Sequence, residues 1–287
     1  MPLPCVTSEM HQKTAIITTL AVVIIGALIT APLYLTPAAP SKTITVFAGA
    51  AAAPVYREAV ELFKNKYGVN VELRLGGSGS LLSAIKITKT GDLYIPGSQD
   101  FMLEAVKAGV VDISYVKKLA YLVPAIIVQK GNPYNIRTLE DLSKSGLRVG
   151  IADPLSVCVG LYAKELLEKN GLWESVKSNI VVYAQSCEAT AALIPTGAVD
   201  AIIGWHVFED WYPDKAERVW IEPSMVHKIG YIAGAVSVFA EDKTLAKRFL
   251  DFLASEEVAK IWAKYGYFAS EKEARQYAPN AFIEDIR

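Results

Sequence analysis

Residues 43–75 read TITVFAGAAAAPVYREAVELFKNKYGVNVELRL, and this stretch indicates the fold class of the protein. It begins with TITVF, a run rich in β-branched residues that is typical of a strand. Between Pro54 and Lys66 the apolar residues recur at helical spacing, and Pro54 suits the first turn of a helix, where its missing N–H costs nothing. Residues 70–75 then alternate apolar and polar side chains, as a half-buried strand does. This strand–helix–strand order predicts an α/β protein with a mostly parallel sheet.

The same alternation of strands and helices continues along the chain, except at two long apolar runs. These runs are YLVPAIIV (121–128) and IGYIAGAVSVF (229–239). Two strands that cross between lobes would explain why the alternation starts again after the first run. We therefore predict two α/β lobes, with lobe one formed by residues 43–122 and 236–287 and lobe two by residues 123–235.

The N-terminal segment has no charged residue between Lys13 and Lys42, and residues 15–35 read AIITTLAVVIIGALITAPLYL. A helix of about 20 apolar residues crosses the ~30 Å hydrocarbon core of a bilayer. An uncleaved signal anchor and a secretory signal peptide both remain open, and the anchor is favoured because signal-peptide cores are usually ~7–15 residues long. Residues 1–42 are thus predicted to form a transmembrane or signal helix followed by a Pro-rich tether. The rest of the chain is expected outside the cytoplasm, anchored to the cell membrane by this helix, or secreted or periplasmic if the helix is cleaved.

The charge balance and the histidines exclude some function classes. The chain has 29 Lys and Arg against 30 Asp and Glu, a net charge of −1, whereas nucleic-acid binding depends on clustered basic residues. Beyond the N-terminal segment, neither His206 nor His227 accompanies a recognisable Ser or Cys nucleophile motif. We therefore expect neither a nucleic-acid partner nor an enzyme, and the residues indicate no cofactor.

Small and hydroxyl-bearing residues recur where predicted strands end and helices begin. The clearest case is LGGSGS (75–80), which is either a tight turn with a Ser helix cap or an anion cradle built from free N–H groups at a helix N-terminus. Similar segments are FAGAAAAP (47–54), DPLSVCV (153–159) and QSC (185–187). None of the four contains Lys or Arg, so an anion held between them would be bound by dipoles and hydrogen bonds.

Cys158 and Cys187 lie in two of these segments. Outside the cytoplasm two cysteines form a disulfide more often than free thiols, so we rank a bridge between them first. Unpaired small apolar residues rank second. A soft-metal site that also uses His206 ranks last, because the three ligands have no characteristic spacing.

Four blocks of the sequence resemble the molybdate- and tungstate-binding proteins of ABC importers. The blocks are ITVFAGAAAAPVYREAVELFKNKYGVNVELRLGGSGSLLSAI (44–85), GDLYIPGSQDFM (91–102), VGIADPLSVCVGLYAKELLEKNGLWESV (149–176) and FLDFLASEEVAKIWAKYGY (249–267). The third block is the most specific, and the resemblance covers nearly all of residues 43–270. It implies a two-lobed periplasmic-binding fold of type II that closes on a tetrahedral oxyanion and delivers it to the permease subunits of an importer.

The resemblance also implies a ligand site at Ala51, Ser78, Val159, Cys187 and Trp205. The second binding serine of the family matches Ser78, whereas the first falls on Ala51, which retains only a backbone N–H. The backbone donors of lobe two fall on Val159 and Cys187, and the tyrosine hydroxyl donor falls on Trp205, whose indole N–H can also donate.

A further departure from the family pattern lies in the third block, where Cys158-Val159 replaces the usual Pro-Ala. Molybdate or tungstate is the first expectation for the ligand. Another small anion, such as sulfate or phosphate, is the alternative within the same class. From a different class, a thiol or soft-metal-binding protein using Cys158, Cys187 and His206 remains open.

Overall fold

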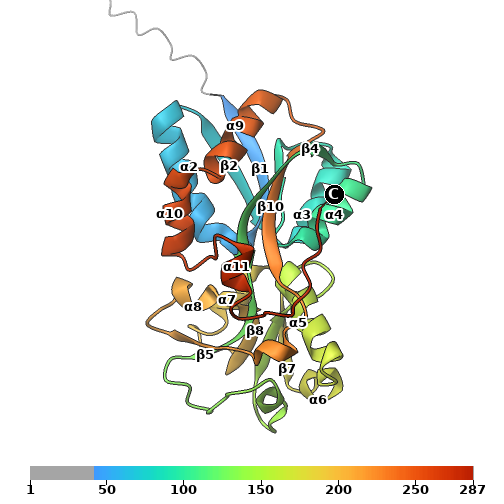
Figure 1. Cartoon of the computed structure of the whole chain (residues 1–287), viewed down its shortest axis with the longest axis vertical. Coiled ribbons are helices and arrows are strands. Elements are labelled where there is room, and N and C mark those ends of the chain that lie inside the picture. The colour runs from blue at the N-terminus through green and yellow to red at the C-terminus, as the bar shows by residue number, and fades with distance from the viewer. Residues whose placement is uncertain (1–41, 287) are drawn as a thin grey trace, which may run out of the picture. The chain divides into compact units, whose positions relative to one another are not determined.

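The computed structural model describes residues 42–286, which fold around two five-stranded sheets (Figure 1). The predicted N-terminal helix lies outside the described residues. Within residues 42–286, no helix is both long enough and apolar enough to cross a membrane.

The first sheet has the strand order β2-β1-β3-β10-β4. Strands β1, β2 and β3 are parallel, and β10 runs antiparallel to both β3 and β4. The strands are β1 (Thr43–Gly49), β2 (Asn70–Gly76), β3 (Leu93–Ile95), β4 (Val111–Leu122) and β10 (Gly230–Ser237). The helices between and after them are η1 (Ala50–Ala52), α2 (Ala53–Tyr67), α3 (Ser78–Thr88), α4 (Gln99–Lys107), α9 (Lys243–Leu253), α10 (Glu256–Lys264) and α11 (Glu271–Ala274).

The second sheet has the strand order β7-β6-β8-β5-β9. Strand β6 is parallel to β7 and β8, while β5 is antiparallel to β8 and β9. The strands are β5 (Pro124–Gln129), β6 (Val149–Ala152), β7 (Ile180–Ala184), β8 (Ala201–Trp205) and β9 (Ala216–Val219). The helices are η2 (Glu140–Ser143), α5 (Cys158–Lys169), α6 (Trp173–Lys177), α7 (Cys187–Ala192), α8 (Phe208–Trp211) and η3 (Pro223–Met225).

Both sheets are mixed, which corrects the expectation of a mostly parallel sheet. The strands on either side of each crossing, β4 and β5 and then β9 and β10, account for the antiparallel pairs. Strand β10 begins level with the end of β4, where Gly230 pairs with Leu122, and β5 begins level with the end of β8, where Pro124 pairs with Trp205. Both strands therefore run away from the edge at which the chain crosses. The parallel order predicted from residues 43–75 is confirmed for β1 and β2, which pair from Thr43 with Asn70 to Gly49 with Gly76.

The chain passes from the first sheet to the second at Val123 and returns between β9 and β10. All of β10 pairs in the first sheet, so we propose to place the second lobe boundary just before Gly230 instead of at residue 236. After α10 the chain runs back over the second half (Figure 1), where Ala274, Ala278 and Ala281 pack in the same apolar cluster as Ile126. We therefore propose to assign residues 274–281 to lobe two.

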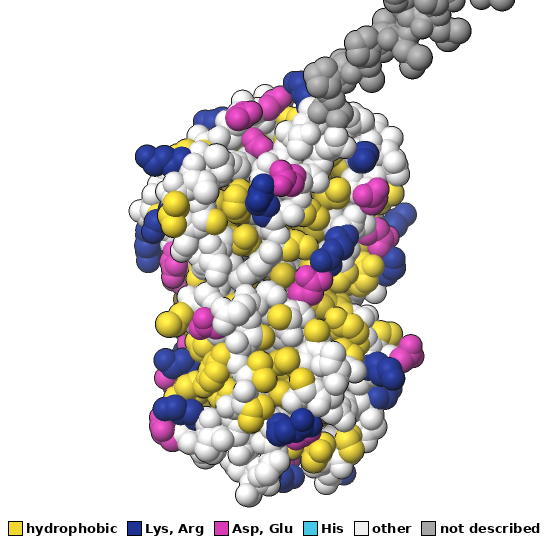
Figure 2. Space-filling view, turned by 180° about the vertical axis from the view of Figure 1, so that it is seen from behind, with side chains coloured by type: hydrophobic (Ala, Val, Ile, Leu, Met, Phe, Trp, Pro, Cys, Tyr) yellow, Lys and Arg dark blue, Asp and Glu magenta, His cyan; other side chains and the backbone are white. Residues whose placement is uncertain are grey.

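The largest apolar cluster joins the two sheets. It contains Ala48 and Ala51 from the first half, and Cys158, Cys187 and Trp205 from the second. The strand ends that the sequence singled out thus meet in one continuous core. On the face drawn in Figure 2, Lys and Arg side chains are interspersed with Asp and Glu, as the balanced composition suggests.

Candidate functional site

Strand register brings three loops of the first half to one edge of the sheet. Because β1, β2 and β3 are parallel, with Ala48 level with both Leu75 and Ile95, their C-terminal ends lie side by side. The loop after β1 carries Ala51, and the segment after β2 begins α3 at Ser78. Both residues are buried. This edge is where open α/β sheets bind ligands.

The loop after β3 completes this edge through Gly97, a residue that the sequence did not single out. A Cβ placed on Gly97 would lie 2.6 Å from Ala51 Cβ, 2.6 Å from Cys158 Sγ and 3.7 Å from Ser78 Oγ. The N–H of Gly97 donates to Ser78 Oγ at 3.0 Å. Gly97 therefore marks the point at which Ala51, Ser78 and Cys158 converge, and only glycine fits there. Its position after a strand parallel to β1 is the signal that could have indicated it.

Two tyrosines hold the backbone of this edge in place. Tyr94 Oη donates to the carbonyl oxygen of Ser78 at 2.9 Å, and Tyr267 Oη donates to the carbonyl oxygen of Ala51. Both side chains are buried, so these hydrogen bonds fix the backbone from which the N–H groups of η1 and α3 project.

The second half contributes the starts of α5 and α7. Strands β6 and β7 pair in parallel up to Ala152 and Ala184, so the helices that follow them begin close together. Their first residues, Cys158 and Cys187, are buried free cysteines whose Sγ atoms lie 3.5 Å apart. The predicted disulfide is not formed here and stays a prediction.

The two thiols have opposite pKa shifts. Burial raises the pKa of Cys158, but Cys187, Trp205 and Ser78, together with the N–H of Val159, stabilise its thiolate and bring the pKa below its ordinary value. Burial and the neighbouring Cys158 raise the pKa of Cys187 well above its ordinary value. Of the two thiols, Cys158 is therefore the one that loses its proton first.

Trp205 ends β8 and is fully buried. Its ring packs edge-on against Tyr162, with ring centroids 4.8 Å apart. Its Nε1–H lies close enough to the sulfurs to favour their thiolate forms, yet it makes no hydrogen bond within the described part of the chain. A buried donor without an acceptor is costly, which makes this N–H a candidate ligand contact.

Tyr56 on α2 is a second such donor, and sequence reasoning missed it. Its hydroxyl is buried and has no partner among residues 42–286, while Cys158 and Cys187 are close enough to contribute to the raised pKa that burial imposes on it. In the sequence Tyr56 is one apolar position of an amphipathic helix. Only the tertiary contacts distinguish it from a core residue.

The two halves are in direct contact around this site. The N–H of Gly79 donates to the carbonyl oxygen of Ser156 at 2.9 Å, and a Cβ on Gly77 would lie 2.7 Å from the same oxygen. On the surface, Arg57 of α2 forms a 2.7 Å ion pair with Glu188 of α7. The site is thus enclosed by loops from both halves.

His206 is a structural residue, so the three-ligand soft-metal interpretation is wrong. Its Nδ1 accepts a hydrogen bond from the N–H of Val123, its Nε2 lies 3.0 Å from the carbonyl oxygen of Gly266, and its ring stacks on Phe268. Burial, reinforced by Arg218, lowers the pKa of His206 to about 3. In residues 42–286 no three His, Cys, Asp or Glu side chains are grouped so that they could hold a metal.

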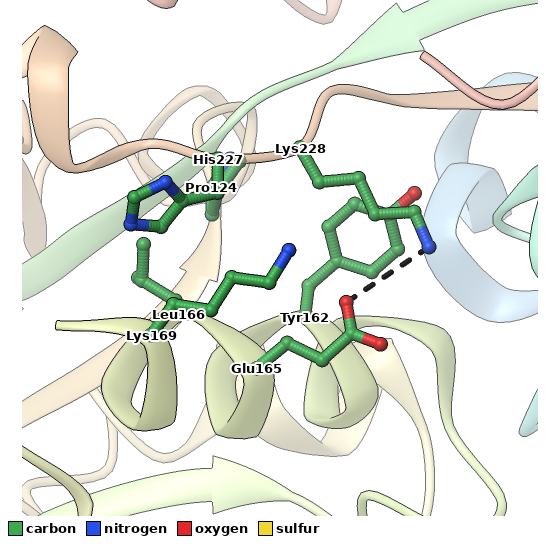
Figure 3. Close-up of a pocket in the computed structure, with 7 residues that line it drawn as sticks. All are labelled: Pro124, Tyr162, Glu165, Leu166, Lys169, His227 and Lys228. Carbon is green, nitrogen blue, oxygen red and sulfur yellow. Dashed lines mark ion pairs between the residues drawn. The ribbon is translucent and has the colours of Figure 1, made fainter. Parts of the chain in front are cut away.

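A charged cluster lies at the second crossing, where Lys228 approaches Glu165 and the ring of Tyr162 (Figure 3). Lys228 pairs with Asp100 of α4 and lies 3.9 Å from both Glu165 of α5 and Glu284. The adjoining pocket encloses about 10 Å³, room for one water at most. This cluster links the two halves by charge and does not have the volume to hold a solute.

Comparison with known proteins identifies the family. The sequence profile of the bacterial extracellular solute-binding proteins matches residues 44–268. The molybdate-binding protein ModA of Escherichia coli is 27% identical over 231 residues, covering 78% of this chain and 88% of that protein.

Solved structures show the same fold. The periplasmic molybdate-binding protein of Azotobacter vinelandii has a TM-score of 0.70 at 14% identity, covering 79% of this chain and 100% of that one. The sulfate-binding protein SubI of Mycobacterium tuberculosis has a TM-score of 0.71 at 21% identity, covering 84% and 93%. These matches confirm the two-lobed α/β periplasmic-binding fold. Since the family profile spans most of the sequence, the chain belongs to the bacterial extracellular solute-binding proteins.

Proposed function

We propose that the chain captures a tetrahedral oxyanion, molybdate or tungstate, outside the cytoplasm and delivers it to the permease of an ABC importer. We further propose that it has no enzymatic activity and that residues 15–35 hold it at the membrane. Membership of the solute-binding family supports the first part, and the molybdate-binding relative supports the choice of anion.

The observation that carries this proposal is that two of the buried donors without an acceptor in residues 42–286, Trp205 Nε1–H and Tyr56 Oη–H, belong to this site. Both lie near the two cysteines, where helix starts from both halves meet. Leaving such groups unpaired costs about 1–3 kcal/mol each, and an anion that accepts hydrogen bonds from both would recover that cost.

The proposed ligand set joins these side chains to backbone donors. It consists of the N–H groups of Ala51, Val159 and Cys187, the hydroxyl groups of Ser78 and Tyr56, and the indole N–H of Trp205. None of these donors is a cation. The set therefore suits a fully dehydrated oxyanion bound through neutral hydrogen bonds and the N-terminus of a helix such as α5.

Isothermal titration of the full 287-residue chain with molybdate, tungstate, sulfate and phosphate tests the proposal. The titrations are made on protein isolated without reductant and again after reduction, because the site contains thiols. Tight binding of molybdate or tungstate in either state, with sulfate and phosphate weaker, is the expected result. Preference for sulfate or phosphate would reassign the ligand, and no heat with any of the four anions would refute the oxyanion function.

A further inference from the structure

We propose that Cys158 and Cys187 form a reversible disulfide, and that the bridged state of the site, rather than the dithiol, binds the oxyanion. This inference rests on the proposed function, because it concerns the same site.

The backbone places the two cysteines where a bridge can form. Each is the first residue of a helix that follows one of two paired parallel strands, β6 and β7. Their Sγ atoms are 3.5 Å apart, so they need to approach by only about 1.5 Å to reach the ~2.05 Å of an S–S bond. Side-chain rotation can supply an approach of this size.

The position of Cys158 Sγ explains why the dithiol should exclude an anion. This sulfur lies against Gly97 and close to Ser78, at the point where the proposed donors converge. Bond formation with Cys187 moves this sulfur from its present position by part of the ~1.5 Å that separates the pair from an S–S bond. Binding in the bridged state requires this movement to free space for a ligand oxygen beside Gly97 and Ser78.

Electrostatic repulsion should also weaken oxyanion binding in the dithiol state. The neighbours of Cys158 favour its thiolate, and the groups with the largest effect on the two thiols include no lysine or arginine. A thiolate and an oxyanion at the same buried point repel each other strongly. The disulfide carries no charge, so it does not repel an oxyanion that accepts hydrogen bonds from Trp205 and Tyr56.

Oxidation proceeds by thiol–disulfide exchange with a low-molecular-weight disulfide. The Cys158 thiolate attacks one sulfur of the oxidant and releases the first thiolate, leaving a mixed disulfide on Cys158. Cys187 then loses its proton to solvent and attacks Cys158 Sγ, which expels the second thiolate. The protein loses two protons and two electrons, and the oxidant becomes two thiols. Both cysteines are buried, so this exchange requires the two halves to separate.

The test uses the full chain with Cys5→Ser, which leaves Cys158 and Cys187 as the two remaining cysteines. The protein is equilibrated with oxidised glutathione or with a phosphine reductant, and the reagent is removed before each measurement. Thiols counted after denaturation should number none in the first sample and two in the second. Molybdate titration should then give an affinity at least about tenfold higher for the oxidised protein.

The double variant Cys158→Ala/Cys187→Ala in the same background separates the effect of the bridge from other effects of oxidant or reductant. Its affinity should be the same after either treatment, and higher than that of the reduced parent, because it has neither sulfur nor thiolate. Two thiols remaining after oxidant treatment, equal affinity in the two states, or tighter binding by the dithiol would each overturn the inference.

Failure of the proposed function has a different signature. If molybdate and tungstate give no heat with the oxidised protein, the reduced protein and the double variant alike, the oxyanion function is refuted and the control of binding falls with it. If the anions bind but the two redox states do not differ, the function stands and only the control by the cysteines is refuted.

Discussion

Replacing Trp205 with phenylalanine tests the role of the indole N–H in ligand binding. Phenylalanine keeps an aromatic ring against Tyr162 but removes the Nε1–H donor, which has no partner in the described residues. A hydrogen bond from this donor to a charged oxyanion is worth about 1.5–3 kcal/mol. We therefore expect Trp205→Phe to weaken molybdate binding by about 10- to 150-fold.

The same substitution should change the stability of the ligand-free protein little. It removes a buried donor that lacks an acceptor, and this gain opposes the loss of packing around the smaller ring. We expect the free energy of unfolding without ligand to change by no more than about 1 kcal/mol. Titration calorimetry measures the affinity, and urea unfolding of the ligand-free protein measures the stability.

Trp262→Phe is the matched control, because the buried Trp262 donates its Nε1–H to the carbonyl oxygen of Leu253 at 3.0 Å. It should destabilise the protein by about 1–3 kcal/mol and leave the affinity unchanged, since phenylalanine retains a ring beside Tyr56. The reasoning is refuted if Trp205→Phe binds molybdate as tightly as the parent, or if both variants lose affinity equally.

Three further substitutions probe the site and the scaffold. Ala51→Ser restores a hydroxyl at a buried position and should tighten molybdate binding about tenfold in a titration; unchanged affinity would place Ala51 outside the ligand contacts. Gly97→Ala puts a Cβ 2.6 Å from both Ala51 Cβ and Cys158 Sγ. It should therefore lower the free energy of unfolding in urea by about 1–3 kcal/mol and abolish molybdate binding. A variant that binds molybdate normally would contradict this close approach. Asp200→Asn should cost about 1.5–3 kcal/mol at neutral pH, because Arg148 donates to both carboxylate oxygens. Burial raises the pKa of Asp200 but these bonds outweigh it, so the stability they supply is present above the unfolded pKa of about 3.9 and is lost as the pH falls through the folded value. Urea unfolding from pH 7 to 3 should therefore show a smaller acid loss for the variant than for the parent, and parallel curves would refute this.

The strand and helix order of this protein follows from short-range patterns in the sequence. Residues 43–75 specify a strand, a helix and a parallel strand because side chains two apart, or three to four apart, share one face of the respective element. The same short-range patterns predicted the four helix starts, including the one at Ser78. They also identified the crossing near Val123, since a long apolar run is buried on both faces.

Which of these segments meet is a matter of packing between distant parts of the chain. The convergence of Cys158 on Gly97, the approach of Tyr56 to the two cysteines and the burial of His206 between Val123 and Gly266 all join residues far apart in sequence. No local periodicity contains that information, because the pattern of Tyr56 is that of any core residue on a helix. Strand register and the contact between the two halves place these groups, and with them the charge and donor balance on which ligand binding depends.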